Sequence, residues 1–256
     1  MATFTNKLRG KKVVIVGGTS GVGLTVAQAI LEFGGEVHVA SSRKATVNAA
    51  LALLGKSYAP EKSHGQVLDL REGSLNEMEA RVSSFLTQIG KVDHYIHFAG
   101  EMPHLAPIAD MNLNAAEKLM QVRLFAAMAA AKTLKKYDLL NPGGSIVLMS
   151  GSPYLKPYAD WTAQASVIGA IVSLGKALAV DLAPIRCNVV ASGPVDTPFW
   201  LGFAADPKPI LQHFGSKCLL GKVAQPEDTA EAFLYCLRDG SLTGSVIITD
   251  GGTLLM

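Results

Sequence analysis

Short apolar runs alternate along the chain with longer segments of helical periodicity. Seven runs rich in β-branched residues predict strands at 13–16, 36–40, 66–68, 95–98, 145–149, 187–190 and 246–249. Segments with helical spacing predict helices between them, among them 22–33, 74–89, 114–136, 162–182 and 227–238. Repeated strand–helix–strand units with right-handed crossovers predict an α/β fold, a doubly wound and mostly parallel sheet with helices on both faces.

The chain carries no low-complexity linker, fixed repeat or composition break, so residues 1–256 are expected to form a single domain. Residues 192–225 have no regular period and contain Pro194, Pro198, Pro207 and Pro209. Long stretches of this kind are usually lids or binding loops. Because it follows the sixth predicted strand, we expect 192–225 to be a substrate loop at the carboxyl end of the sheet, where open α/β sheets bind ligands.

Composition excludes several classes of protein. With 49% hydrophobic and 17% charged residues, the chain is too apolar to be disordered. Its 23 Lys and Arg against 21 Asp and Glu leave a charge of +2, too small and too evenly spread for a nucleic-acid-binding face. No uninterrupted apolar run reaches the length of a membrane span and the first residues lack a secretory pattern, so we expect no membrane partner and a cytoplasmic location. The three cysteines form no C-x-x-C pair, and no metal site is predicted.

A glycine-rich loop, Gly17-Gly18-Thr19-Ser20-Gly21-Val22-Gly23, directly follows the first predicted strand and opens an apolar helix. Glycines allow the backbone to approach a pyrophosphate closely, and the helix start offers unpaired N–H groups. The position of the loop in the first βαβ unit predicts a Rossmann-type dinucleotide site. The residues predicted to hold the pyrophosphate are Gly17, Thr19, Ser20, Gly21, Val22 and Gly23.

The end of the second predicted strand indicates which dinucleotide is bound. An acidic residue there accepts hydrogen bonds from a free ribose 2′-OH, but this chain has Ser41, Ser42, Arg43 and Lys44 instead. Hydroxyls and cations suit a 2′-phosphate, so NADP(H) is favoured over NAD(H). In the alternative, Arg43 and Lys44 only solvate a helix start, which leaves the missing acid unexplained. Asp69-Leu70, after the third strand, is expected at the adenine edge.

Several motifs in order resemble those of the short-chain dehydrogenase/reductase superfamily over essentially the whole chain. The glycine loop is similar to its T-G-x-x-x-G-x-G, with Val16 in place of Thr, and Ala99-Gly100 closes its N-N-A-G motif. Further matches are Asp69, 193–197, 225–228, 243–244 and 250–252. The resemblance implies a cofactor contact at Ala99, Gly100, Pro194, Val195 and Thr197, with Val195 and Thr197 at the nicotinamide carboxamide.

The two helices predicted at 114–136 and 162–182 are apolar nearly all round and must be buried on more than one side. The resemblance implies that these helices pair subunits, so a homodimer or homotetramer is expected.

The catalytic Asn, Ser, Tyr and Lys of that superfamily are replaced in this chain. Alignment of 164–170 with its Y-x-x-x-K-x-A motif puts Gln164 at the Tyr and Ile168 at the Lys. The Ser position falls at Gly151 and the Asn position at Arg123. Reduction of a carbonyl needs a proton from the Tyr, whereas an iminium carbon accepts hydride and becomes a neutral amine without one. The missing acid therefore favours an imine or iminium substrate.

A site for a cationic substrate is expected to offer carboxylates and π faces. The candidate catalytic residues are Glu101 after the fourth strand, Asp160 and Tyr158 beside Trp161, and Arg123 in an apolar helix. A buried Arg123 should meet a carboxylate or a substrate oxygen. The alternatives are that Arg123 is a salt-bridged or solvent-facing side chain and that Glu101 and Asp160 are ordinary loop carboxylates.

A subset of fungal biosynthetic proteins is similar in these departures, with a V-G-G-T-S-G opening and V-R at the Asn position. This group of reductase/Diels–Alderases and Pictet–Spengler cyclases implies hydride transfer or cyclisation on a small-molecule substrate, an indole alkaloid imine, iminium or amine. An Asp stands in the reductase/Diels–Alderases where this chain has Tyr158, and Asp160 could substitute from two residues away. Two other functions stay open: a non-catalytic NADP(H)-binding protein, and a carbonyl reductase that uses Tyr158 as its acid.

Overall fold

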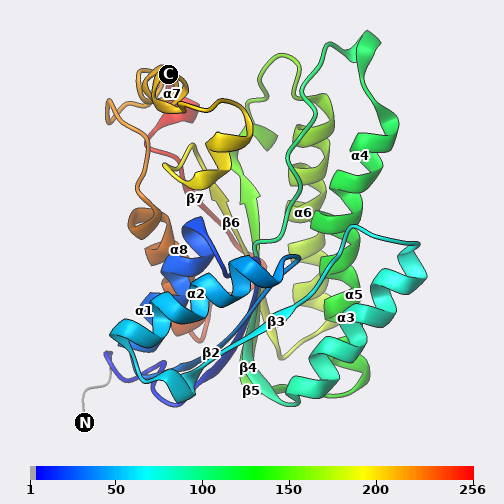
Figure 1. Ribbon diagram of the computed structural model, residues 1–256, viewed down its shortest axis with the longest axis vertical. Coiled ribbons are helices and arrows are strands. Elements are labelled where there is room, and N and C mark those ends of the chain that lie inside the picture. The colour runs from blue at the N-terminus through cyan, green and yellow to red at the C-terminus, as the bar shows by residue number, and fades with distance from the viewer. Residues whose placement is uncertain (1–3) are drawn as a thin grey trace.

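The computed structural model describes residues 4–256. Its centre is a seven-stranded sheet in the order β3-β2-β1-β4-β5-β6-β7, with every neighbouring pair parallel (Figure 1). The predicted doubly wound α/β fold is confirmed. The strands are β1 (Lys12–Val16), β2 (Glu36–Ser41), β3 (Ser63–Val67), β4 (Val92–His97), β5 (Leu140–Gly151), β6 (Arg186–Ser192) and β7 (Val246–Thr249).

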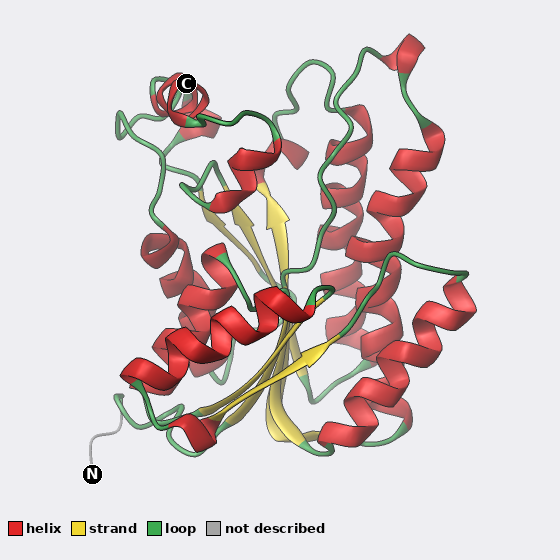
Figure 2. Ribbon diagram, viewed as in Figure 1, coloured by secondary structure: helices red, strands yellow, loops and turns green. Residues whose placement is uncertain are grey.

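Helices cover both faces of the sheet (Figure 2). On one face α1 packs against α8, and on the other α3 packs against α5 and α4 against α6. Two apolar clusters, one on each side, form the core. The helices are α1 (Gly21–Glu32), α2 (Lys44–Ser57), α3 (Leu75–Ile89), α4 (Leu113–Met120), α5 (Ala126–Lys136), α6 (Thr162–Asp181), α7 (Lys208–Gly215) and α8 (Pro226–Arg238).

The segment predicted as a helix at 114–136 is helical throughout, but its hydrogen-bond pattern changes in the middle. A π-helical turn over Gln121–Phe125 separates α4 from α5. Such turns insert one extra residue into a helix and are frequent at functional sites. Arg123 lies at the middle of this turn.

The substrate loop expected at 192–225 is partly helical. A 3₁₀ turn spans Pro198–Gly202, and α7 runs from Lys208 to Gly215. Proline is favourable in the first turn of a helix, because the N–H that it lacks has no partner there. Pro207 and Pro209 therefore mark the start of α7, although in the sequence they suggested a loop.

Helix α6 is long and apolar enough to cross a membrane by length and composition, and it is the single such helix within residues 4–256. It packs on β5 and β6, and Val167, Ile168 and Ile171 lie in the protein interior. These contacts are those of a core helix.

Candidate active site

A cavity of about 650 Å³ opens beyond the carboxyl ends of the strands. Its wall takes residues from the glycine loop, the end of β2, the segment after β4, the π turn, the start of α6 and the segment after β6. This is the end of the sheet at which open α/β folds bind their ligands, because the loops that follow parallel strands gather there.

The glycine loop fits a pyrophosphate. All six residues predicted to hold it line the cavity. Gly17 has a φ of +85°, and a Cβ on it would lie 2.6 Å from the backbone nitrogen of Ala99. A Cβ on Gly23 would overlap the carbonyl oxygen of Gly17. Helix α1 begins at Gly21 with no side chain capping its N-terminus, so its first N–H groups remain available for an anion.

The end of β2 presents Ser41, Ser42 and Arg43 to the cavity, as predicted, together with Thr46. The Thr46 hydroxyl donates to the carbonyl oxygen of Arg43 at 2.8 Å and lies 3.1 Å from the Ser41 hydroxyl, which holds the turn in place. No carboxylate lies on this part of the cavity wall. The residues therefore suit a phosphate on the adenosine ribose better than a free hydroxyl.

Asp69 lies outside the cavity wall, although its neighbours Leu68 and Leu70 line it. Its carboxylate accepts the backbone N–H of Arg71 at 2.8 Å and lies 3.7 Å from the Arg71 Nε. Asp69 therefore shapes the turn after β3, and its contact with the adenine edge stays a prediction.

The residues that the family resemblance placed at the nicotinamide end all line the cavity. Thr197 also packs against the glycine loop, since a Cβ on Gly21 would lie 3.2 Å from the Thr197 Cβ. The indole of Trp200 donates to the carbonyl oxygen of Val195 at 2.7 Å, which fixes the segment after β6. The set that lines this end is Ala99, Gly100, Pro194, Val195 and Thr197.

The four positions aligned with the family's catalytic residues meet in this cavity. Arg123, Gly151, Gln164 and Ile168 all lie on its wall. Ser150, next to Gly151, donates its hydroxyl to the Ile168 carbonyl oxygen at 2.8 Å and is thereby occupied. Within residues 4–256 no lysine lines the cavity, so the Tyr–Lys proton donor is not rebuilt from another element.

Arg123 lies over Gly100, because a Cβ on that glycine would overlap the guanidinium group. Its Nε is buried and has no hydrogen-bond partner. Burial lowers the pKa of Arg123 to about 10, and the charge of Glu101 opposes that shift. A buried donor without a partner is costly, so the Nε of Arg123 is available to an oxygen atom of a ligand.

His97 holds the turn that carries Arg123, and the sequence analysis did not assign it a role. Its Nε2 lies 3.0 Å from the carbonyl oxygen of Val122 and its Nδ1 lies 2.8 Å from the Tyr95 hydroxyl. Since a carbonyl can only accept, Nε2 donates and Nδ1 accepts from Tyr95. Burial lowers the pKa of His97 to about 4, which keeps the ring neutral. His97 stands at the first asparagine of the N-N-A-G motif, and this replacement was the signal available.

Glu101 lines the cavity and forms an ion pair with Arg71, whose Nε lies 3.4 Å from its Oε1. Burial raises the pKa of Glu101 above its ordinary value, although the charges of Arg71 and Arg123 act against the shift. The carboxylate is thus near the space that a ligand would occupy, and a cation there would stabilise its charged form.

Tyr158 and Trp161 line the cavity, whereas Asp160 does not. Asp160 is exposed and has a left-handed backbone with a φ of +67°. Burial, followed by the charges of Cys218 and Asp250, raises the pKa of the Tyr158 phenol. Of the four predicted catalytic residues, the structure brings Arg123, Glu101 and Tyr158 to the cavity and leaves Asp160 at the surface.

An aromatic wall, formed by Tyr158, Trp161, Trp200 and Phe214, closes one side of the cavity. The ring centroids of Tyr158 and Trp161 lie 5.2 Å apart, those of Tyr158 and Phe214 5.6 Å, and those of Trp200 and Phe214 5.1 Å. Sequence reasoning missed Phe214, which comes from α7. The only available signal was the density of aromatic residues in 192–225.

The fold and this cavity define a dinucleotide-binding reductase-type protein, and the family is shown by direct comparison. Residues 4–256 match the model described as an SDR-like Rossmann domain, and the chain belongs to the short-chain dehydrogenase/reductase (SDR) family. The predicted membership is confirmed.

Its relatives include fungal reductases. The chain is 34% identical over 255 residues to short-chain dehydrogenase/reductase malC of Malbranchea aurantiaca, covering 97% of this chain and 96% of malC. It is 34% identical over 263 residues to ucsE of Acremonium sp, covering 100% of both.

Two solved structures are similar over nearly the whole chain. The MalC reductase/Diels–Alderase from Malbranchea aurantiaca has a TM-score of 0.90 and 33% identity, covering 98% of this chain and 99% of that one. A small-chain dehydrogenase in complex with NADPH has a TM-score of 0.80 and 31% identity, covering 96% and 99%.

Proposed function

We propose that this protein is an NADP(H)-dependent enzyme of fungal secondary metabolism that acts on an imine or iminium, by hydride transfer or by stereocontrolled cyclisation. One observation carries the proposal. Gln164 and Ile168 line the cavity where an SDR enzyme has its Tyr and Lys, and an aromatic wall closes the same space. The related MalC reductase/Diels–Alderase and the NADPH-bound dehydrogenase support it.

The residues that would hold the dinucleotide are the glycine loop and helix start for the pyrophosphate, Ser41 to Arg43 for the 2′-phosphate, and Ala99, Val195 and Thr197 for the nicotinamide. When bound, NADP(H) supplies a hydride donor and a flat, charged surface beside the substrate. The chain's own residues then decide which electrophile is accepted.

This cavity is poorly suited to carbonyl reduction, because the alkoxide product needs a proton donor. An amide such as Gln164 donates a hydrogen bond but does not release the proton at neutral pH. An arginine side chain donates hydrogen bonds and does not give up its proton in proteins, so Arg123 would orient a substrate oxygen. The raised pKa of Tyr158 makes this phenol a weaker acid than a free tyrosine. An iminium substrate needs none of these proton transfers.

The remaining groups suit a cationic, partly aromatic substrate. The faces of Tyr158 and Trp161 stabilise a cation by π interactions, and the Glu101 carboxylate supplies a compensating charge. Arg123 would bind a carbonyl oxygen at the other end of the substrate, since its Nε has no partner in the protein. The substrate class that unites these features is an indole alkaloid imine or iminium that also carries an amide or ketone oxygen.

Stopped-flow absorbance at the reduced-nicotinamide band tests this function with a cyclic iminium and the cyclic ketone of the same skeleton. We expect NADPH to be consumed with the iminium and not with the ketone. Product formed without loss of NADPH would identify the cyclase form of the activity. Rapid turnover of the ketone would contradict the proposal. Tight NADPH binding without turnover of either substrate would support a non-catalytic NADP(H)-binding protein instead.

Substitutions at Tyr158 separate a π face from an acid. Tyr158→Phe should leave iminium turnover within about threefold, because the ring is retained, whereas Tyr158→Ala should reduce it by about tenfold through loss of the cation–π contact. Tyr137→Phe, on an exposed ring at the end of α5, is the matched control. Loss of turnover in Tyr158→Phe would instead support a carbonyl-type proton transfer.

A further inference from the structure

Three metal-ligating side chains gather at the amino ends of β2 and β3, at the opposite end of β2 from Ser41 and the cavity. Glu36 and His38 are two residues apart on β2, so they point to the same face of the sheet. His64 on β3 is the register partner of His38. Neighbouring strands thus bring one carboxylate and two imidazoles together.

The ligand atoms of these residues lie close together. The Glu36 Oε1 lies 3.0 Å from the His38 Nε2 and 3.4 Å from the His64 Nε2, and the three ligand atoms lie within 4.8 Å of one another. The two imidazole rings are stacked with centroids 4.4 Å apart. Zinc bonds of 2.0–2.1 Å in a tetrahedron place neighbouring ligand atoms about 3.3 Å apart, which agrees with both distances from Glu36.

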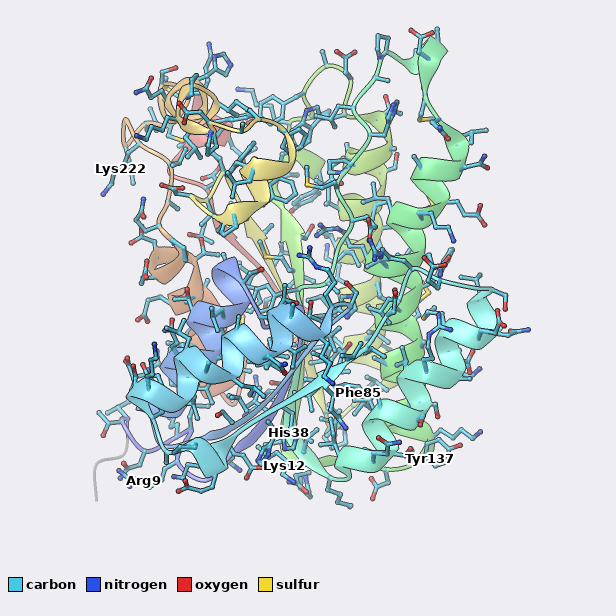
Figure 3. All side chains as sticks on the ribbon, in the orientation of Figure 1. Arg9, Lys12, His38, Phe85, Tyr137 and Lys222 are labelled. Atoms are coloured by element: carbon cyan, nitrogen blue, oxygen red, sulfur yellow. The ribbon has the colours of Figure 1, made fainter. Side chains whose placement is uncertain are left out.

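The cluster is accessible to an ion and its histidines are suited to binding one. The exposed fractions of the side chains are 16% for His38, 34% for Glu36 and 43% for His64. Burial lowers the pKa of His38, although the hydrogen bond to Glu36 acts against the shift. A bound cation would replace the proton that Nε2 donates to the Glu36 carboxylate. Lys12 also reaches this oxygen, with its Nζ 4.0 Å from the Glu36 Oε1, and Figure 3 labels Lys12 beside His38. A lysine at that distance is a weak competitor of a divalent cation.

We propose that Glu36, His38 and His64 form a zinc site, with water as the fourth ligand. Two imidazoles and a carboxylate are an established ligand set for Zn²⁺. The ion would join β3, at the edge of the sheet, to β2 by bonds between side chains. Because β3 pairs with one neighbour, β2, and is otherwise held by α2, such a link would stabilise this edge. The inference is independent of the reaction proposed above.

Calorimetric titration of Zn²⁺ into untagged, chelator-treated protein tests the site. We expect one equivalent of Zn²⁺ per chain, a rise in the thermal midpoint on binding, and a visible absorption band when Co²⁺ replaces Zn²⁺. His64→Ala should weaken binding by at least about tenfold and abolish the rise in the midpoint, since loss of a ligand exceeds the effect of losing an outer-shell partner. His64→Gln serves if the alanine variant fails to fold.

Two control variants complete the test. His104→Ala removes an exposed histidine outside the cluster and should leave the titration unchanged. Lys12→Ala should strengthen binding, because it removes the competing cation from Glu36. Equal affinity in the wild type and His64→Ala, or no binding in the wild type, would overturn the proposal. None of these measurements depends on NADP(H) or on turnover.

Discussion

At the scale of residues, we expect one side chain on the cavity wall to select the cofactor. Arg43 and Lys44 are adjacent cations, but of the two only Arg43 lines the cavity. A hydrogen bond to a charged group contributes about 1.5–3 kcal/mol, which corresponds to roughly 10–100-fold in affinity. Substitution of Lys44 is therefore a matched control for substitution of Arg43.

Arg43→Ala should raise the dissociation constant of NADPH by about 10–100-fold and leave that of NADH within about twofold, because only NADPH carries the 2′-phosphate. Lys44→Ala should change neither. Fluorescence titration of the reduced cofactors measures all four constants. An equal loss of both cofactors in Arg43→Ala would show that this arginine does not select the phosphate.

Arg123 is a partly buried cation whose buried Nε lacks a partner. We therefore expect its contributions to stability and to turnover to have opposite signs. Arg123→Met keeps much of the volume and removes the charge. We expect turnover to fall by about 10²–10³-fold, because removal of one hydrogen-bond donor to a reacting oxygen has an effect of that size. The free energy of unfolding should stay equal or increase. Steady-state rates and urea unfolding measure the two effects.

The surface residue Asp160 offers the control for that variant. Asp160→Asn retains a residue type that tolerates its φ of +67° and should leave both turnover and stability unchanged. Wild-type turnover in Arg123→Met, or a large loss in Asp160→Asn, would reverse the roles that the structure gives these two residues.

At the scale of elements, the π turn between α4 and α5 carries Arg123, which lines the cavity. The turn is held from outside by the hydrogen bond from His97 on β4 to the Val122 carbonyl oxygen. The guanidinium then rests on Gly100, at a distance that only a residue without a Cβ permits. Three separate elements thus determine the position of one side chain.

Gly100→Ala should displace Arg123, because the added Cβ overlaps its guanidinium group, and should lower turnover by about tenfold or more while the glycine loop still binds NADPH. Gly55→Ala is the control, since a Cβ there meets nothing closer than 3.9 Å inside α2. Steady-state kinetics and cofactor titration distinguish the effects on turnover and on binding. Wild-type turnover in Gly100→Ala would mean that the position of Arg123 is unimportant.

For the whole molecule, two buried histidines couple folding to pH. Burial lowers the pKa of His94 to about 3 and of His97 to about 4. The unfolded chain binds protons at these residues below the ordinary value of 6.5, whereas the folded chain does not. Stability therefore falls as the pH drops from 6.5 toward the folded pKa values.

Between pH 7 and pH 5, each histidine should lower the free energy of unfolding by about 2 kcal/mol. His97→Asn removes one of the two and should reduce this pH dependence accordingly, while His104→Gln at an exposed position should not change it. Urea unfolding at both pH values measures the difference. The same pH dependence in the wild type and His97→Asn would show that His97 is not buried as a neutral ring.

The exposed apolar side chains of α4, α5 and α6 support the expected homodimer or homotetramer. Leu113, Met128 and Val180 are exposed by 70%, 41% and 77%. We propose that a second copy covers these helices, in agreement with the resemblance to SDR proteins.

Light scattering should give the mass of a dimer or tetramer for the wild type and a smaller mass for Val180→Lys, because a charge would be buried in the interface. Leu53→Lys, at an exposed position on α2, should not change the mass. A monomeric wild type would contradict this prediction.

The sequence by itself determined the α/β fold, the dinucleotide loop, the preference for a 2′-phosphate and the loss of the Tyr–Lys pair. The fold follows from the alternation of strands and helices along the chain. The other three depend on residues within a few positions of one another, so that local spacing is enough to predict them. Tertiary structure alone decided that Phe214 reaches the cavity, that Asp160 turns away and that His64 lies beside His38. Those arrangements follow from strand register and packing between distant segments, and from a π turn whose single extra residue a 3.6-residue periodicity does not reveal.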